Sequence, residues 1–308
     1  MPTPDPSDTL TPPRVEMVIA LPGDRKIGVA EFGPAGGRPI LWFHGTPGGR
    51  NQIPEPLRRS LEDLDVRLVV VERPGYGDST RYLHPTIRAF GDDVEKILDA
   101  LGIDRFGVAA LSGGGPYALG VGHTFADRVV AVSVLGGVVP RVGPEALPGG
   151  LIDALSPIAG VARVANRPVG AALGWTIKLM SPFGSSAFQL ITQTLPLFPP
   201  GDKAVFAQPH MQSMFMGDIV QSAQGGLSGP VLDLVLFTRH WGFELGDVAV
   251  PVHFWQGDAD PLVSLEQGTK MAEAVPESYL VVRHGESHLG GFATAVDAVD
   301  AILGHWPT

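Results

Sequence analysis

The 308-residue sequence has no cysteine, which excludes disulfide bonds, thiolate nucleophiles and cysteine-bound metal ions. Charged residues make up only 18%, the net charge is −10, and lysine and arginine form no run. A nucleic-acid binder needs clustered cations to replace the counterions of phosphate, so we expect no nucleic-acid partner and no binding to anionic membranes. No stretch of about 18 apolar residues is free of charge and proline, so no membrane span is expected.

The N-terminal sequence MPTPDPSDTLTPP lacks the basic and apolar segments of a signal peptide. Proline at this density opposes both helix and sheet, so residues 1–13 are expected to form a flexible arm. Together with the missing membrane span, these features predict a cytoplasmic protein. Hydrophobic residues make up 44%, which is enough for a sizeable buried core.

Short apolar runs alternate with helical patterns along the chain. The first two runs alternate between apolar and polar residues and predict an opening pair of strands, whereas the later runs are near-continuous, as a parallel sheet covered on both faces requires. Repeated strand–helix–strand order predicts a doubly wound, mostly parallel α/β sheet. The predicted strands are 15–20, 27–32, 39–43, 67–71, 106–110, 129–135, 250–255 and 279–282, and the predicted helices are 86–101, 113–123, 265–274 and 293–303.

A long segment without a good strand pair interrupts this alternation at residues 140–247. Proline and glycine break it every 10 to 20 residues, which favours short helices lying over another surface. We therefore predict a helical cap at 140–247 inserted into a core of residues 14–139 and 248–308, with a second independent domain as the alternative. The cap helices are expected at 149–155, 169–180, 187–194, 204–214 and 229–240.

The segment 107–115 reads GVAALSGGG, in which an apolar run is followed by Ser112 and by glycines that open a predicted helix. This order predicts a strand–turn–helix nucleophile elbow, whose strained turn exposes the serine hydroxyl. The turn is tight, so the residues two before and two after the serine must be small, as Ala110 and Gly114 are. A plain loop whose serine caps the helix is the alternative.

The segment 44–49, HGTPGG, directly follows the apolar run PILWF. Here the chain resembles the α/β-hydrolase superfamily, in which a His-Gly-x-Pro-type loop after the third strand donates a backbone N–H to the oxyanion hole. The resemblance implies oxyanion donors at Thr46 and Gly113, with His44 and Gly45 supporting the loop. The segment 72–79, ERPGYGDS, is similar to the superfamily's turn after the fourth strand. Taken alone, HGTPGG is equally typical of a simple turn.

Two later loops also follow predicted strands. WQGDADPLV at 255–263 resembles the superfamily's acid loop, whose spacing selects Asp260 over Asp258. RHGESHLG at 283–290 follows the last strand, and His288 matches the superfamily's histidine position, with His284 as its competitor. The two histidines are four residues apart, but they lie in a loop with no third ligand in view, so no metal site is expected. Turn residues are the alternative for both aspartates.

The order Ser112, Asp260, His288 is that of the superfamily, and the resemblance covers nearly the whole chain except the cap. It implies a serine hydrolase that cleaves a carboxylic ester or related acyl bond through an acyl-enzyme on Ser112. His288 would act as the base and Asp260 as the acid that orients it. No cofactor and no metal are expected. The serine argues against haloalkane dehalogenases and epoxide hydrolases, which carry aspartate at the elbow.

The cap is expected to choose the substrate. The segment MQSMFM at 211–216 is rich in methionine, which adapts its shape to ligands. We predict an apolar substrate pocket with contributions from Met211, Met214, Phe215 and Trp241, and hence a small apolar acyl substrate. Packing of the cap helices on each other is the alternative for most of these side chains.

Three other functions fit the same motifs. HGTPGG is close to the corresponding loop of proline iminopeptidases, which carry a bulky aromatic residue where this chain has Gly113 and which need cap acids, here Asp218, Asp233 or Glu244. A carbon–carbon bond hydrolase would use the same triad. A non-catalytic ligand-binding or signalling protein could keep the fold alone.

Overall fold

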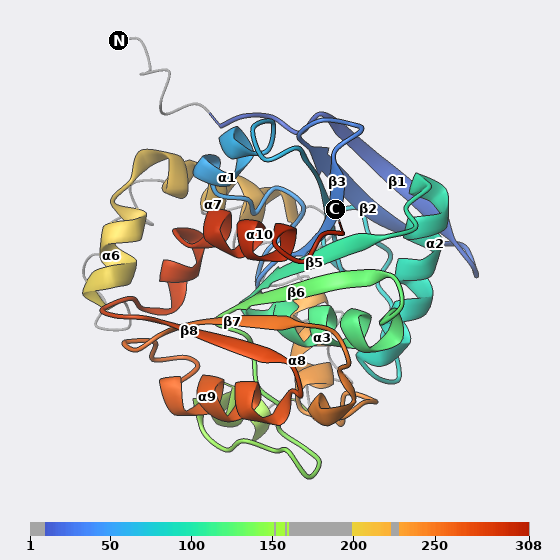
Figure 1. Ribbon diagram of the computed structural model, residues 1–308. Coiled ribbons are helices and arrows are strands. Elements are labelled where there is room, and N and C mark those ends of the chain that lie inside the picture. The colour runs from blue at the N-terminus through green and yellow to red at the C-terminus, as the bar shows by residue number, and fades with distance from the viewer. Residues whose placement is uncertain (1–9, 151, 158, 160–198, 223–227, 308) are drawn as a thin grey trace.

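The structure is a computed structural model that describes residues 10–150, 152–157, 159, 199–222 and 228–307. Its centre is an eight-stranded sheet with the order β1-β2-β4-β3-β5-β6-β7-β8 (Figure 1). β2 is antiparallel to both of its neighbours, and all other pairs are parallel, so the predicted mostly parallel sheet is confirmed. The strands are β1 Val15–Leu21, β2 Arg25–Phe32, β3 Arg38–Phe43, β4 Val66–Val71, β5 Phe106–Leu111, β6 Val129–Leu135, β7 Val252–Gly257 and β8 Ser278–Arg283.

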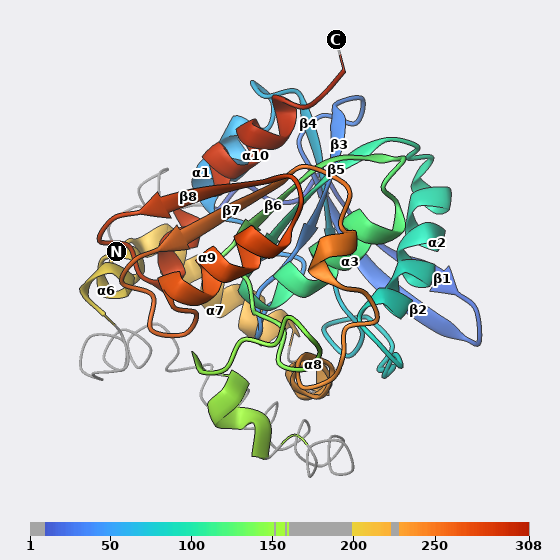
Figure 2. The same ribbon diagram turned by 60° about the horizontal axis from the view of Figure 1, so that its bottom comes forward.

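Helices cover both faces of the sheet. One face carries α2 (Gly91–Leu101), α3 (Gly115–Thr124) and α9 (Leu265–Ala274), and the other carries α1 (Glu55–Ser60) and α10 (Ala295–Leu303), as Figure 2 shows. This two-sided cover explains why the sequence of β3 is continuously apolar. Leu41 and Phe43 join the core on the first face, Ile40 and Trp42 join the core on the second, and all four are fully buried.

Several helix starts differ from the sequence prediction. A 3-10 turn, Arg88–Phe90, precedes α2, and another, Ser112–Gly114, precedes α3. Gly102 ends α2 with a left-handed φ of 63°, as expected for a glycine stop. The sequence does not predict α1, because six residues are too few to show a helical period.

The described part of the predicted cap includes α6 (Pro200–Phe206), α7 (Pro209–Ser222) and α8 (Ser228–Phe237), which lie between β6 and β7. The prediction of one helix at 204–214 is wrong. Pro209 has no N–H to continue α6, and its ring would clash with the carbonyl four residues earlier. Residues 152–157 are helical, close to the predicted 149–155. The predicted helices at 169–180 and 187–194 lie outside the described residues.

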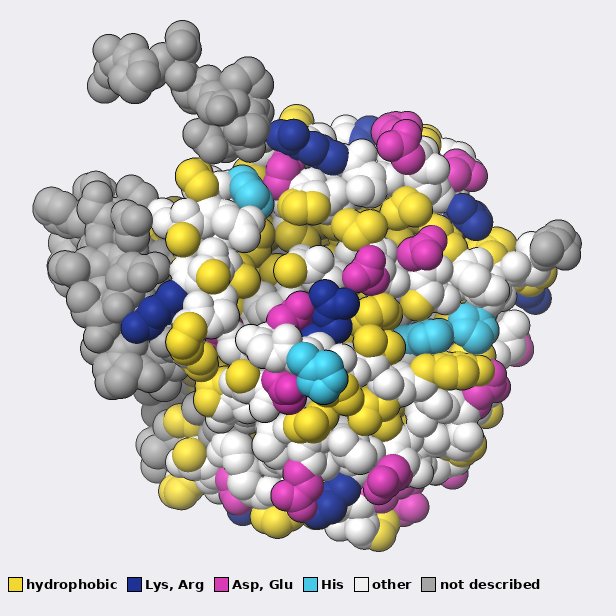
Figure 3. Space-filling view, turned by 60° about the vertical axis from the view of Figure 1, so that its left-hand side comes forward, with side chains coloured by type: hydrophobic (Ala, Val, Ile, Leu, Met, Phe, Trp, Pro, Cys, Tyr) yellow, Lys and Arg dark blue, Asp and Glu magenta, His cyan; other side chains and the backbone are white. Residues whose placement is uncertain are grey.

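The surface mixes side chains of all types. On the face in Figure 3, the described lysine and arginine side chains lie apart from one another among acidic and apolar ones. Within the described ranges, no helix combines the length and the apolar character needed to cross a bilayer.

Candidate active site

The candidate catalytic residues lie at one edge of the sheet. Ser112 follows β5, Asp260 follows β7 and His288 follows β8. These strands run in the same direction, with β6 between β5 and β7, so their carboxyl ends meet at the edge where open α/β sheets bind ligands.

The turn that carries Ser112 has the strained geometry predicted for an elbow. Ser112 has a φ of 50°, a left-handed value that non-glycine residues rarely adopt. A Cβ on Gly114 would lie 2.8 Å from the carbonyl oxygen of His44, and one on Gly113 would lie 2.8 Å from the Cβ of Thr46. The turn therefore leaves no room for a side chain at either glycine.

His288 connects the other two residues. Its Nε2 lies 2.8 Å from Ser112 Oγ, and its Nδ1 lies 2.8 Å from Asp260 Oδ2. A carboxylate only accepts hydrogen bonds, so Nδ1 carries the proton and Nε2 is free to accept the serine proton. Asp260 and His288 are both 7% exposed. The geometry is that of a serine–histidine–aspartate relay.

Backbone and side-chain donors fix the carboxylate of Asp260. Its Oδ1 accepts the N–H groups of Leu262 and Val263 at 2.8 and 3.0 Å, and its Oδ2 accepts Gln256 Nε2 at 3.2 Å. The oxygen that faces His288 therefore belongs to a carboxylate that other donors already hold in place.

The competing pair lies elsewhere. Asp258 Oδ2 is 2.9 Å from His284 Nδ1, and Asp258 Oδ1 accepts the N–H of Gly285. The His284 side chain is 86% exposed, and neither residue lines the cavity beside Ser112. The hydrogen bond from His284 lowers the pKa of Asp258. The two aspartates and two histidines thus sort into two separate pairs.

His44 has a structural position rather than a reactive one. It is fully buried, with its Nδ1 2.7 Å from the carbonyl oxygen of Gly45 and its Nε2 accepting the N–H of Arg73 at 3.3 Å. Burial, together with the nearby Arg73, lowers the pKa of His44 well below its usual value. His44 is therefore a neutral part of the loop's support.

The expected oxyanion donors lie next to each other. Thr46 and Gly113 approach so closely that a Cβ on Gly113 would overlap the Thr46 side chain. Neither backbone N–H takes part in a turn or loop hydrogen bond between described residues. Both residues stay candidates for the donor role.

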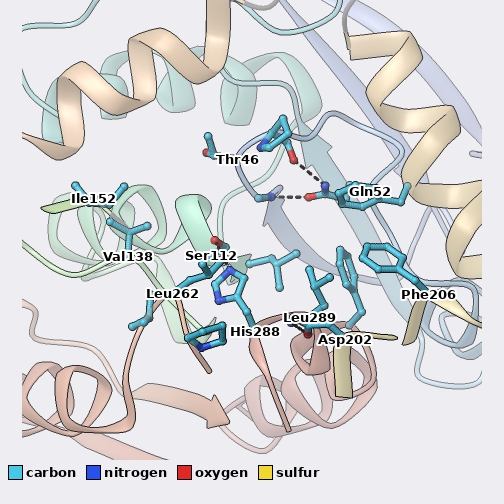
Figure 4. Close-up of a pocket in the computed structure, with 17 residues that line it drawn as sticks. Thr46, Gln52, Ser112, Val138, Ile152, Asp202, Phe206, Leu262, His288 and Leu289 are labelled. Carbon is cyan, nitrogen blue, oxygen red and sulfur yellow. Dashed lines mark hydrogen bonds between the residues drawn. The ribbon is translucent and has the colours of Figure 1, made fainter. Parts of the chain in front are cut away.

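Sequence reasoning missed the residues that hold this loop. Gln52 Oε1 accepts the N–H of Gly45 at 2.6 Å, and its Nε2 donates to the carbonyl oxygen of Pro47 at 3.0 Å (Figure 4). Arg73 donates to the carbonyl oxygens of His44 and Gly45 and pairs with Asp233 on α8. No local motif marks these contacts, although the ERPGYGDS segment includes Arg73.

A cavity of about 270 Å³ lies over Ser112 and His288. In Figure 4, Val138 and Ile152 lie to one side of these two residues and Phe206 lies to the other. Among the residues that the structure describes, the polar lining residues are Thr46, Gln52, Ser112, Asp202 and His288, and the other lining side chains are Pro47, Leu111, Val138, Ile152, Phe206, Phe215, Pro261, Leu262, Val263, Leu289 and Phe292. The cavity is therefore apolar on both sides of the candidate nucleophile.

Asp202 is a second acidic residue at the candidate site, and no sequence motif predicts it. It lies on α6, is 4% exposed, and accepts hydrogen bonds from the hydroxyl of Ser287 and the N–H of Leu289 through Oδ1. Its Oδ2 has no hydrogen-bond partner among the described residues. Asp202 therefore braces the loop that carries His288 and is also one of the residues that line the cavity.

Of the predicted pocket residues, Phe215 lines the cavity and the other three do not. Met211 and Met214 are buried in the core cluster that includes α1 and α10, because the side of α7 that carries them packs inward. Trp241 packs against Phe243, with ring centroids 6.0 Å apart. The prediction that Met211, Met214 and Trp241 line the pocket is therefore wrong, and these side chains pack in the interior instead.

The cap acids considered for binding an amine also lie off the cavity lining. Asp218 and Asp233 are each 2% exposed, and Glu244 is exposed on the surface. Among the residues that the structure describes, no group of three or more histidine, aspartate or glutamate side chains could hold a metal ion.

Comparisons with known proteins point to one fold. Residues 38–157 match a family described as "alpha/beta hydrolase fold". "Putative carbamate hydrolase RutD" of Caulobacter sp. (strain K31) is 32% identical over 107 residues, which cover 34% of this chain and 40% of that protein. "Probable proline iminopeptidase" of Leptolyngbya boryana is 30% identical over 109 residues, which cover 34% of this chain and 33% of that protein. The chain thus matches less than half the length of either curated relative.

Solved structures extend this likeness to the whole fold. The enol-lactonase from Burkholderia xenovorans LB400 has a TM-score of 0.68 at 19% identity, covering 94% of this chain and 99% of that one. At this level of identity the similarity shows the fold alone.

Proposed function

We propose that this chain, which has the α/β-hydrolase fold, is a serine hydrolase that forms an acyl-enzyme on Ser112. The observation that carries the proposal is the placement of His288 between Ser112 Oγ and Asp260 Oδ2, at 2.8 Å from each. Serine is a poor nucleophile at neutral pH and needs a base at this distance.

The reaction follows from these contacts. His288 Nε2 takes the proton of Ser112 as the hydroxyl oxygen attacks the substrate carbonyl, and Asp260 stabilises the imidazolium that forms. The N–H groups of Thr46 and Gly113 stabilise the oxyanion. His288 then protonates the leaving group, and a water molecule activated by the same histidine hydrolyses the acyl-enzyme.

The lining of the cavity supports a substrate class. Leu111, Val138, Leu289 and their neighbours offer an apolar wall with few polar groups, which suits an ester with an apolar acyl group. We infer that residues 140–247 act as the cap over this site, since α6 and α7 contribute Asp202, Phe206 and Phe215 to the lining.

Ester turnover tests the proposal. Purified protein is assayed with 4-nitrophenyl esters of increasing acyl length, beside the Ser112→Ala variant. We expect turnover that is lost in the variant and that favours apolar acyl chains over acetate. Turnover that survives in Ser112→Ala would contradict the proposed nucleophile, and a flat chain-length profile would contradict the acyl pocket.

A peptidase is the second candidate, and the open Oδ2 of Asp202 favours it. A carboxylate at the wall of an apolar cavity can accept a hydrogen bond from a substrate ammonium group. The lack of room beside Gly113 weighs against it, since proline iminopeptidases carry an aromatic residue there. Cleavage of proline 4-nitroanilide faster than of a matched ester would move the assignment to this candidate.

A further inference from the structure

A buried carboxylate on α8 gathers four side chains behind the oxyanion loop. Asp233 is 2% exposed and lies off the cavity lining. Burial and the charge of Asp233 raise the pKa values of Tyr76 and Tyr117 well above their usual values, so both phenols stay protonated and donate. The donors to the carboxylate are Thr46 Oγ1 at 2.6 Å and Arg73 Nη2, Tyr76 Oη and Tyr117 Oη at 2.7 Å each.

The guanidinium of Arg73 joins this carboxylate to the backbone of the loop. Arg73 is fully buried and donates to the carbonyl oxygen of His44, to the carbonyl oxygen of Gly45 at 3.1 Å and to Thr46 Oγ1 at 2.9 Å. One rigid, planar group therefore contacts three consecutive residues of the loop. Asp233 fixes the plane of that group through the nitrogen that faces Gly45 and Thr46.

These contacts, together with His44 Nδ1 at 2.7 Å from the Gly45 carbonyl oxygen, set the direction of one peptide unit. In a trans peptide, the C=O of one residue and the N–H of the next point in opposite directions. The Gly45 carbonyl oxygen faces the buried Arg73, so the N–H of Thr46 faces away from Arg73. Thr46 lines the cavity and Arg73 does not, which is consistent with a Thr46 N–H on the cavity side of the peptide. A rotated peptide would instead present a carbonyl oxygen to a developing oxyanion and would leave part of the guanidinium without an acceptor.

We infer that Asp233 and Arg73 are positioning residues that hold the Gly45–Thr46 peptide in the orientation an oxyanion hole requires. The inference rests on the proposed function, because it assigns the Thr46 N–H a role in that reaction. It also gives the inserted segment a second role, since α8 then helps to assemble the site as well as to cover it.

A charge-balanced double variant tests the inference. Removing one charge alone would leave the other buried and unpaired, which is strongly destabilising, whereas Arg73→Met with Asp233→Asn removes both charges together. The amide introduced at position 233 keeps an oxygen that accepts a hydrogen bond from a phenol. The matched control is Arg67→Met with Glu31→Gln, a second ion pair at 2.7 Å that lies at the opposite end of β4, where Glu31 also pairs with the partly exposed Arg14. Thermal unfolding verifies that both double variants fold.

Two measurements decide the outcome: the rate at which a fluorophosphonate modifies Ser112, and a crystal structure of the double variant. We expect a loss of roughly 100-fold in the modification rate and in kcat for an ester, with KM changed less than about threefold, as for loss of one oxyanion donor. The crystal structure should show the Gly45–Thr46 peptide rotated. The control should stay within about threefold of the wild-type rate.

Each contrary result removes a different claim. A peptide that keeps its orientation in the double variant overturns the positioning role, whatever the rates. A rotated peptide with wild-type rates overturns the link between this peptide and the oxyanion. A wild-type protein that neither reacts with the probe nor hydrolyses esters overturns the proposed function itself, and the oxyanion role falls with it.

Discussion

At the scale of single residues, two aspartate–histidine pairs follow β7 and β8, and one of them faces Ser112. Asp260 and His288 are buried beside the serine, whereas Asp258 and His284 pair with each other at the surface. The two aspartates lie two residues apart, so they form a matched pair for mutation.

Asp260→Asn should lower kcat about 10⁴-fold, because an amide no longer holds His288 in the tautomer that accepts the serine proton. Asp258→Asn should change kcat less than about threefold. Both are measured by steady-state ester hydrolysis. An equal loss in the two variants would show that the acid has been assigned to the wrong contact.

Gly113→Ala should lower kcat by roughly 100-fold, because the new Cβ displaces Thr46 from its place beside the elbow. Gly36→Ala is the control, since a Cβ there meets no atom within 4 Å. The comparison uses kcat and the fraction of folded protein from circular dichroism. Wild-type kcat in a folded Gly113→Ala variant would contradict the close packing of Thr46 on Gly113.

The sequence reveals the candidate triad because each member lies in a loop directly after an apolar strand, and the parallel sheet brings those strand ends together; spacing like that of the superfamily separates Asp260 from Asp258 and His288 from His284. It does not reveal the supporting residues. Arg73 and Asp233 lie 160 positions apart, and their contact depends on how α8 packs on the core. Gln52 lies outside the HGTPGG segment but accepts the N–H of Gly45 within it, and no sequence motif predicts this contact.

At the scale of elements, α6, α7 and α8 each place one buried aspartate against a loop of the core. Asp202 on α6 contacts the loop of His288, Asp218 on α7 accepts the N–H of Asn51, and Asp233 on α8 contacts Thr46. Hydrogen bonds of this kind join the inserted helices to the loops that form the candidate site.

Asp218 gives α7 a pH-dependent stability. Burial raises its pKa to about 7, with Glu72 adding to the effect and the N–H of Asn51 opposing it. The unfolded chain would ionise Asp218 near pH 4, so the folded state favours the proton. The contribution of Asp218 to stability is therefore greatest below about pH 4 and is lost as pH rises toward 7.

Asp218→Asn should remove this dependence. Relative to the wild type, the variant should gain on the order of 2–4 kcal/mol in unfolding free energy between pH 4 and pH 8. Urea unfolding at several pH values measures the difference. Asp104→Asn, at a fully exposed side chain, should show no such gain. Parallel pH curves for the wild type and Asp218→Asn would contradict the raised pKa.

The central strands follow the predicted runs closely because both faces of the sheet are buried there, which makes sequences such as those of β3 and β5 continuously apolar. Helices depend more on context. The period of 204–214 spans the break between Phe206, where α6 ends, and Pro209, where α7 begins, and α1 is too short for its period to be recognised.

At the scale of the whole molecule, the net charge of −10 and the carboxylate of Asp202 both disfavour the binding of anionic substrates. The overall charge lowers the encounter rate of anionic ligands, an effect that salt screens. Asp202 acts inside the cavity, where screening is weaker.

An ester with a neutral acyl group should therefore be hydrolysed at least roughly tenfold faster, in kcat/KM, than its carboxylate-bearing analogue. Raising the salt concentration should reduce part of the difference in kcat/KM between the two esters. Asp202→Asn should reduce the rest, and the asparagine oxygen can still accept the N–H of Leu289. Equal kcat/KM values for the two esters at low salt would contradict this expectation.

The central claim is that Ser112 is an activated nucleophile, and labelling with a fluorophosphonate probe followed by peptide mass mapping tests it most directly. We predict one label per chain, on Ser112, and loss of the label in a folded His288→Ala variant. A chain that stays unlabelled under conditions that label a known serine hydrolase, or that carries the label on another residue, would contradict the claim.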